Sequence, residues 1–266
     1  VAGTSAGAIV AALVAAGYTA AEIREILKGL DYNRFKDRSP LDRVPVVGPL
    51  ASLLFEKGIY EGDFFQDWMG GLLKAKGVET FGQLVCEEFQ DDERYRFKLR
   101  VIASDITRGR MLILPQDISE YGVRPEDLNA ALAVRMSMSI PFFFEPITFR
   151  NIKTGERSYI VDGGLLSNFP VWLFDTTDDT PAWPTFGFKL AEPEEGTPRK
   201  ISGPVSLLTA LFATMMGAYD ARYIEDQDFV RTIAIPTLGV GTTEFDISPE
   251  RSEALYQSGR QAAEKF

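Results

Sequence analysis

The fold of this chain is decided by its opening stretch, Val1-Ala2-Gly3-Thr4-Ser5-Ala6-Gly7-Ala8-Ile9-Val10-Ala11-Ala12-Leu13-Val14-Ala15-Ala16. It consists of a β-branched residue, a G-x-S-x-G motif and an Ala-rich run that favours a helix, which is the sequence form of a nucleophile elbow. In such an elbow a strand turns sharply into a helix, and a serine stands at the apex with its Oγ exposed. The stretch therefore predicts Ser5 as a nucleophile. A glycine-rich turn that only packs tightly is the alternative.

The residues around Ser5 are small, as the chemistry of an elbow requires. Gly3 and Gly7 would let the backbones of strand and helix pass close together. Ala6 would leave its backbone N–H free to face a developing oxyanion. The helix that begins behind Ser5 adds a partial positive charge at the same place. We therefore expect Gly3, Ala6 and Gly7 to shape the elbow and its oxyanion site.

The length and composition fit one α/β domain. The chain has 266 residues, of which 45% are hydrophobic, and Gly and Pro separate its apolar segments. This is enough for one sizeable core. Helix and strand patterns alternate without an internal repeat or a linker, which favours helices on both faces of a sheet. We predict a single domain over residues 1–266, with three α/β/α layers and a mostly parallel central sheet.

The charge and the cysteine count exclude several functions. The formal net charge is −10 and the isoelectric point is about 4.7, which argues against binding to nucleic acid and against electrostatic adhesion to anionic lipid. A neutral or hydrophobic substrate fits this balance better. The single cysteine, Cys86, excludes an internal disulfide and a Cys-based metal cluster. No apolar run reaches the length of about 18 residues that a membrane span needs.

The chain contains no histidine. A Ser-His-Asp triad, a Cys-His dyad and a His-ligated metal site are therefore impossible within it. If Ser5 is a nucleophile, its base must be a carboxylate or a lysine. The lysines in or near predicted elements, none of which lies in a supporting motif, are Lys28, Lys57, Lys98 and Lys189.

A second stretch whose residues could take part in catalysis is Asp162-Gly163-Gly164, which directly follows a predicted strand over residues 158–161. Open α/β sheets bind their ligands at the carboxyl ends of strands, where this carboxylate would lie. Glycines at 163 and 164 permit close approach of another backbone or of a substrate. An ordinary Asp-Gly turn is the alternative interpretation of this stretch taken alone.

Other elements follow from hydrophobic periodicity and turn patterns. Strands are expected over residues 96–106, 111–114, 185–190 and 232–235, and helices after residues 19, 63 and 125, over 207–219 and over 249–266. The helix after residue 19 would open with a capping box formed by Thr19 and Glu22. Residues 33–55 are irregular and apolar: burial is the simpler interpretation, and a mobile flap over a lipid-binding cleft is the alternative.

Three polar residues near these stretches are interpreted as structural rather than catalytic. Asp105 would close a turn at the end of a strand, and Arg135 would pair with Asp105 or with Glu145. Asn168 would hold a turn, and positioning of the loop that carries Asp162 is the alternative.

Four stretches, in order, resemble the patatin-like phospholipase family of lipid acyl hydrolases. They are residues 3–7, 103–109, 137–146 (Ser-Met-Ser-Ile-Pro followed by Phe144-Glu145-Pro146) and 162–170. The resemblance implies a catalytic dyad without histidine, formed by Ser5 and Asp162, with Gly163 and Gly164 in the loop of the base. No metal and no cofactor are expected, and the sequence has no D-x-D-x-D-G loop that would bind calcium.

The resemblance also implies a glycine-rich oxyanion loop upstream of the elbow strand. That loop would precede Val1, so we expect the sequence to be N-terminally incomplete and its first strand region to be truncated. The expected substrate is a lipid or another ester, with transient contact to a membrane surface, no nucleic-acid partner and a cytoplasmic location. A non-catalytic lipid- or partner-binding protein of the same fold is the alternative.

An ordinary aspartate titrates near 3.9 and is a weak base toward an alcohol. The predicted mechanism is a two-step acyl transfer through an acyl-enzyme, in which Asp162 accepts the proton of Ser5 and later activates a water. A site of this kind must therefore desolvate the aspartate, hold a short contact and stabilise the oxyanion strongly.

Overall fold

The computed structural model describes most of the residues of the chain. They are residues 1–35, 60–175, 183–191, 230–241 and 246–266, with the single positions 201, 203, 207, 210, 211, 214, 215 and 244. The α-helices are α1 (Ala6–Ala15), α2 (Ala20–Lys28), α4 (Asp63–Ala75), α5 (Ala130–Ser137) and α8 (Pro249–Lys265). The strands are β1 (Ala2–Thr4), β2 (Arg100–Asp105), β3 (Arg110–Leu114), β4 (Ile147–Arg150), β5 (Arg157–Asp162), β6 (Gly187–Ala191) and β7 (Thr232–Pro236).

Strand β2 is the centre of the five-stranded sheet. Every residue of β2 is buried, and β3 pairs with it from Val101 to Asp105 along one edge. The other edge is shared, because β1 pairs with residues 100–102 and β5 with residues 103–105. Strand β4 then pairs with β5 and ends the path. Two strands that are far apart in the sequence therefore meet on one edge of β2.

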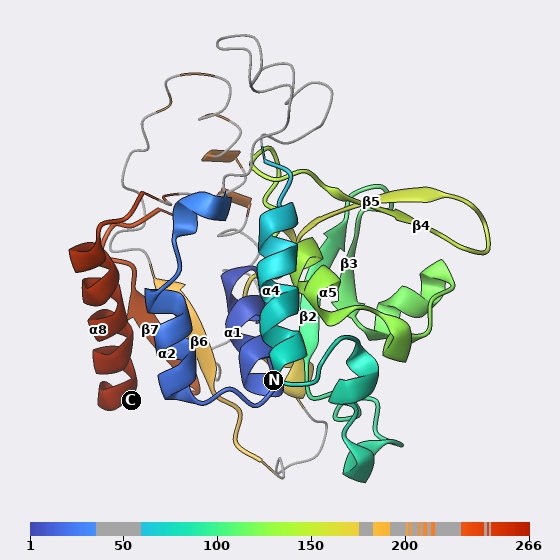
Figure 1. Ribbon diagram of the computed structural model, residues 1–266, viewed down its shortest axis with the longest axis horizontal. Helices are drawn as coiled ribbons and strands as arrows, with labels where there is room; N and C mark the ends of the chain where they lie inside the picture. The colour runs from blue at the N-terminus through green and yellow to red at the C-terminus, as the bar shows by residue number, and fades with distance from the viewer. Residues whose placement is uncertain are drawn as a thin grey trace.

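Three helices pack together on this sheet. Helices α1, α4 and α5 contact one another, and α1 and α5 also contact the strands, which places them side by side over the sheet (Figure 1). The small residues of α1 allow close packing: Ala8 and Ala12 are fully buried against the core. Helix α4 contributes Phe65, Met69 and Leu73, which recur at helical spacing and are also buried. The predicted apolar faces thus form one hydrophobic core.

The predicted α/β class, with helices packed on a central sheet, is confirmed, but the sheet is mixed rather than mostly parallel. In the described pairings of the five-stranded sheet, β1–β2 is parallel, and β2–β3, β2–β5 and β4–β5 are antiparallel. Two of these antiparallel pairings, β2–β3 and β4–β5, follow from the short turns after β2 and β4, since hairpin connections produce antiparallel neighbours. Strands β6 and β7 form a separate parallel pair.

Most predicted element boundaries hold to within a few residues. The capping box of Thr19 and Glu22 is present at the start of α2. The helix expected after residue 125 is divided: a 3-10 turn over Pro125–Asp127 precedes α5, which Asn129 caps by accepting a hydrogen bond from the Leu132 N–H at 2.8 Å. The proposed flap over residues 33–55 and the helix over 207–219 lie largely outside the described residues.

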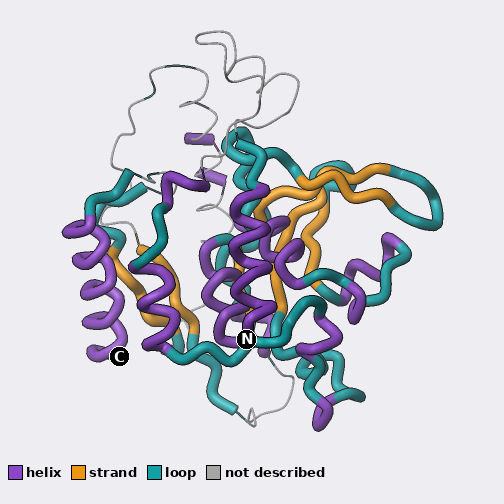
Figure 2. The backbone as a smooth tube through the Cα atoms, in the orientation of Figure 1, coloured by secondary structure: helices purple, strands orange, loops and turns teal. Residues whose placement is uncertain are grey.

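The last helix packs beside the second one. Helix α8 contacts β7, and Figure 1 shows α8 and α2 side by side; Figure 2 shows the two strands β6 and β7 next to them. The guanidinium of Arg24 forms an ion pair with Glu253 at 3.6 Å and lies 4.5 Å from the centre of the Tyr256 ring. Within the described ranges, no helix has the length and apolarity needed to cross a membrane.

Candidate active site

The candidate site lies where β1 and β5 meet. Strand β1 runs parallel to β2 and ends with Thr4 opposite Ile102, whereas β5 runs antiparallel to β2 and ends with Asp162 opposite Ala103. The two strands therefore run toward each other along one edge and stop at adjacent residues of β2. The next residue after β1 is Ser5. Sheet register therefore places Ser5 and Asp162 near each other although they are 157 positions apart in the sequence.

Ser5 stands at a sharp turn between β1 and α1. Its φ is 52° and its ψ is −127°, a conformation that non-glycine residues rarely adopt and that costs about 1–3 kcal/mol. The turn brings the two backbones so close that a Cβ on Gly3 would lie 2.3 Å from the carbonyl oxygen of Gly7. Ser5 Oγ donates a hydrogen bond to Asp162 Oδ2 at 2.6 Å. The predicted elbow is thus present, with its serine aimed at a carboxylate.

Asp162 is fully buried, whereas Ser5 retains 8% of its surface. The second carboxylate oxygen of Asp162, Oδ1, accepts a hydrogen bond from the Gly164 N–H at 2.7 Å. Burial raises the pKa of Asp162 to about 7, although the hydrogen bonds from Ser5 and from Gly164 act in the opposite direction by stabilising the carboxylate. A carboxylate with a pKa near neutrality is a much better proton acceptor than an ordinary aspartate.

The chain turns away from the sheet directly after Asp162, at Gly163. A Cβ at this position would lie 2.2 Å from the carbonyl oxygen of Ile102, so only glycine allows the backbone to pass β2 here. The 3-10 turn η7 (Gly163–Leu165) follows, and it presents the N–H of Gly164 to the Asp162 carboxylate. The two glycines therefore have separate roles in placing the carboxylate.

Ala6 and Gly7, the two elbow residues that follow Ser5, differ in whether the structure agrees with the role expected for each. Ala6 is exposed at the start of α1, and no hydrogen bond from its N–H is found among the described residues, as is usual in the first turn of a helix. Gly7 was expected to permit close packing, but a Cβ there would meet nothing within 4 Å. The close approach is made by Gly3 against the Gly7 backbone, so the steric constraint lies on Gly3 alone.

A segment without a role in the sequence interpretation contacts both dyad residues. The Ser5 N–H donates to Ser137 Oγ at 2.8 Å, and Ser5 Oγ lies 3.7 Å from Met138 Sδ. The Asp162 N–H donates to the Ser139 carbonyl oxygen at 2.9 Å. The sequence indicates this segment only through the family resemblance, because no local pattern shows which distant backbone groups a buried serine will bind.

The residues interpreted as structural remain apart from the dyad. Asp105 is buried: its Oδ1 accepts from the N–H groups of Thr107 and Arg108, and its Oδ2 accepts from the Tyr121 hydroxyl at 2.5 Å. It closes a turn, as predicted. Arg135, also buried, donates to the backbone carbonyl oxygens of Glu61, Gly62 and Glu145 and to Ser139 Oγ.

The lysine alternative has no support among the described residues, since no lysine there hydrogen-bonds to Ser5 Oγ. The hydrogen-bonding partners of Ser5 Oγ in the described chain are Asp162 Oδ2 and Met138 Sδ. Lys28, Lys98 and Lys189 are not among them, and Lys57 lies outside the described residues. The described hydrogen-bond partners of the Asp162 side chain are Ser5 and Gly164. Asn168 is not among them.

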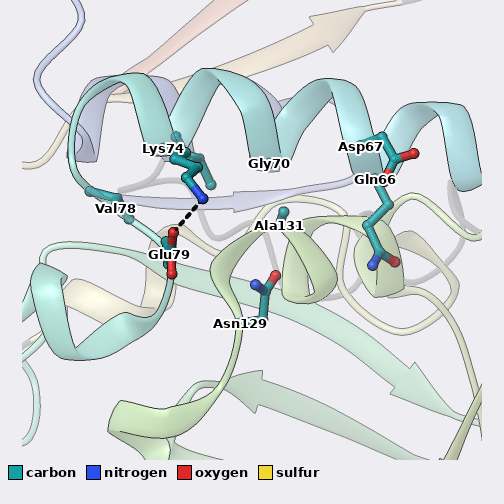
Figure 3. A pocket seen from close by; sticks show the side chains of 9 residues that line it. Gln66, Asp67, Gly70, Lys74, Val78, Glu79, Asn129 and Ala131 are labelled. Carbon is teal, nitrogen blue, oxygen red and sulfur yellow. Dashed lines mark ion pairs between the residues drawn. The ribbon is translucent and has the colours of Figure 1, made fainter.

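A separate cavity of about 280 Å³ lies between α4 and the start of α5. Figure 3 shows Gln66, Asp67 and Lys74 on one wall and Asn129 and Ala131 on the other, with Lys74 and Glu79 joined by an ion pair of 3.0 Å. Neither Ser5 nor Asp162 lines this cavity. In the described part of the chain, no group of three or more Asp, Glu or Cys side chains is close enough to hold a metal ion.

The strand–serine–helix elbow is present, and its serine contacts a buried carboxylate. Comparison with known proteins identifies the family. The family model described as patatin-like phospholipase matches residues 1–175, which is more than half of the chain. The chain belongs to the patatin-like phospholipase family.

Two relatives are similar over nearly the whole chain. Uncharacterized protein YqhO of Bacillus subtilis (strain 168) is 40% identical over 271 residues, which cover 100% of this chain and 87% of the relative. Uncharacterized protein R571 of Acanthamoeba polyphaga mimivirus is 24% identical over 270 residues, which cover 97% of this chain and 79% of the relative.

Solved structures give a more distant likeness. VipD from Legionella pneumophila is 18% identical with a TM-score of 0.44, and the type III effector ExoU is 13% identical with a TM-score of 0.45. The match covers 99% and 98% of this chain, and the chain spans 60% of VipD and 45% of ExoU. At these TM-scores the likeness adds nothing to the family assignment.

Proposed function

We propose that the protein is a lipid acyl hydrolase in which Ser5 is the nucleophile and Asp162 is the general base. The family is that of patatin-like phospholipases, which supports hydrolysis of lipid esters in general. The observation that carries the specific proposal is the 2.6 Å hydrogen bond from Ser5 Oγ to a fully buried Asp162. Nucleophilic hydrolases require such a contact between nucleophile and base.

In the first half-reaction, Ser5 Oγ attacks the ester carbonyl carbon while its proton passes to Asp162 Oδ2. The negative charge that develops on the carbonyl oxygen would lie near the Ala6 N–H and the N-terminal end of α1. When the tetrahedral intermediate collapses, the bond to the alcohol oxygen breaks and the Asp162 proton passes to that oxygen. The products of this half-reaction are a free alcohol and an acyl-Ser5 ester.

In the second half-reaction, a water molecule takes the place of the alcohol. Asp162, again a carboxylate, accepts a proton from the water as the water oxygen attacks the acyl carbon. Collapse of this intermediate breaks the bond to Ser5 Oγ, which recovers the proton from Asp162. The carboxylic acid leaves, and the site returns to its starting state. Asp162 thus moves a proton in both directions, as a pKa of about 7 allows.

The rival function is a non-catalytic lipid- or partner-binding protein that retains the fold. A binding role has no chemical need for a nucleophile in contact with a buried base, so the Ser5–Asp162 geometry favours the hydrolase. A fluorophosphonate probe separates the two. We expect covalent labelling that peptide mass spectrometry maps to Ser5 and that Ser5→Ala abolishes; an unlabelled, folded full-length protein would support the binding role.

A neutral glycerolipid or another uncharged ester is the substrate class that the net charge of −10 favours. We also propose that the protein makes transient contact with a membrane surface and that it is cytoplasmic.

A further inference from the structure

We infer that Ser137 is a positioning residue for the proposed nucleophile: its hydroxyl fixes the backbone of Ser5 and thereby the direction in which Ser5 Oγ points. The inference rests on the proposed function of the Ser5–Asp162 pair, and it concerns a residue that takes no part in the proton transfers themselves.

The first observation is the place of the Ser137 hydroxyl in the sheet. β1 and β2 form a parallel ladder in which the Arg100 N–H donates to the Val1 carbonyl oxygen. Continued in register, such a ladder would pair the Ser5 N–H with the Ile102 carbonyl oxygen. Instead, the Ser5 N–H donates to Ser137 Oγ at 2.8 Å, and Ser137 Oγ donates to the Ile102 carbonyl oxygen at 2.6 Å. The hydroxyl is inserted into the ladder at the point where β1 leaves the sheet.

The second observation is that this link is buried and saturated. Ser137 has no exposed surface, and it belongs to α5, whose residues are almost all buried. Its hydroxyl uses its single proton on Ile102 and accepts the Ser5 N–H with a lone pair. Removing the hydroxyl would leave a buried N–H and a buried carbonyl oxygen without this partner, which is unfavourable for both groups.

The third observation is that the same segment holds the other half of the dyad. Two residues after Ser137, the Ser139 carbonyl oxygen accepts the Asp162 N–H at 2.9 Å. The Ser139 hydroxyl donates to the Arg135 carbonyl oxygen at 2.8 Å and accepts from the Arg135 guanidinium at 2.5 Å, so the end of α5 is itself fixed. One short, rigid segment therefore sets the backbone positions of both Ser5 and Asp162.

Ser5 depends on such a restraint because its own backbone conformation is unfavourable. A non-glycine residue at φ 52° and ψ −127° relaxes unless the surrounding structure holds it. Without Ser137 Oγ, the Ser5 N–H loses the one hydrogen bond that it makes in the described structure. A displacement of the elbow would lengthen the contact between Ser5 Oγ and Asp162, and a misplacement of about 1 Å costs about 10²-fold in rate.

The experiment compares wild-type full-length protein with Ser137→Ala and with Ser104→Ala. Ser104 is the matched control: it is a fully buried serine, and its Oγ has no hydrogen-bond partner in the described structure. Two readouts are used: the titration of the Asp162 carboxyl carbon by NMR, which requires no substrate, and kcat and KM on a p-nitrophenyl ester. Thermal unfolding monitors the stability of each variant.

We expect Ser137→Ala to lower kcat about 10²-fold with KM little changed, and to move the titration midpoint of Asp162 upward. The direction follows because the hydrogen bond from Ser5 lowers the pKa of Asp162, so weakening that bond raises it. Ser104→Ala should behave as wild type in both readouts. Ser137→Cys keeps a weak donor and acceptor at the same place and should fall between wild type and Ser137→Ala; it also carries the test if Ser137→Ala does not fold.

A purely structural role gives a different result. If Ser137→Ala lowers thermal stability but leaves both kcat and the Asp162 titration unchanged, the inference is wrong. Failure of the proposed function is recognised separately: the wild type would then show no hydrolysis that depends on Ser5. In that case the titration of Asp162 still decides whether Ser137 positions the pair.

Discussion

Thr4 and Asp162 end two strands that run toward each other along the same edge of β2, and they pair there with neighbouring residues, Ile102 and Ala103. This end-to-end meeting accounts for the site, because the residue after Thr4 is the elbow serine. One strand delivers a hydroxyl and the other a carboxylate to the same point. The 2.6 Å contact between Ser5 and Asp162 is thus a consequence of sheet register and of the turns that follow each strand.

The steric limits at the elbow predict opposite outcomes for two glycines. Gly3→Ala should lower the free energy of unfolding by about 1–3 kcal/mol, since its Cβ would lie 2.3 Å from the Gly7 carbonyl oxygen, a backbone atom. Gly7→Ala, the matched control, has open space and should keep the stability or raise it by up to about 1 kcal/mol, because Ala favours a helix over Gly. Chemical denaturation measures both; equal losses in the two variants would contradict the described packing.

The burial of Asp162 predicts that it destabilises the folded protein at neutral pH. An unfolded aspartate binds its proton near pH 3.9, whereas folded Asp162 binds it near 7. Between these values the folded state holds more protons than the unfolded state, so stability falls as pH rises, by up to about 4 kcal/mol in total. Asp162→Asn lacks this titration and should be more stable than wild type at pH 8.

Urea unfolding of wild type and Asp162→Asn at pH 4, 6 and 8 measures this difference. The stabilisation by Asp162→Asn should be small at pH 4, grow through pH 6 and level off above pH 7. A stabilisation that is the same at all three pH values would show that Asp162 does not titrate in this range in the folded protein.

The same carboxylate predicts the pH dependence of catalysis. Only the ionised form of Asp162 accepts the Ser5 proton, so kcat/KM should rise with pH, about tenfold per unit well below pH 7, and level off above it. The profile is measured on a substrate that does not titrate over this range, with stability verified at each pH. A plateau that extends down to pH 5 would mean that the base has an ordinary aspartate pKa.

Asp105, the second buried carboxylate, should contribute to stability but not to catalysis. Tyr121→Phe removes the hydroxyl that donates to Asp105 at 2.5 Å and should lower the free energy of unfolding by about 1–3 kcal/mol. Because Asp105 closes a turn and does not contact Ser5, kcat of the folded variant should stay within about twofold of wild type. Thermal unfolding and ester hydrolysis are measured on the same samples; a large loss of kcat at temperatures where the variant is folded would give this turn a catalytic role.

The sequence was most informative where short-range chemistry decides the structure. The G-x-S-x-G elbow indicated Ser5, and the absence of histidine limited its base to a carboxylate or a lysine. The family resemblance, carried in part by the Asp-Gly-Gly stretch, indicated Asp162, and the structure brings these two side chains together. Each of these features is local: a turn that needs small residues, or a residue type that is present or missing.

Features that depend on long-range register could not be predicted in the same way. Hydrophobic alternation identifies β2 and β5 but does not give their relative direction, so the sheet was expected to be mostly parallel and is mixed. The steric role assigned to Gly7 was wrong, because a motif does not show which of its glycines faces the neighbouring backbone. The link from Ser5 through Ser137 to Ile102 joins three segments of the chain and has no local pattern.

The measurement that tests the central claim most directly is hydrolysis of a short p-nitrophenyl ester by full-length wild type, Ser5→Ala and Asp162→Asn. Asp127→Asn, which changes an exposed carboxylate in an ion pair with Arg124, is the control. We predict that Ser5→Ala and Asp162→Asn both fall to background, a loss of about 10²–10⁴-fold for removal of a general base, while Asp127→Asn retains wild-type activity. If Asp162→Asn keeps most of the activity that Ser5→Ala loses, the base lies elsewhere and the dyad is wrong.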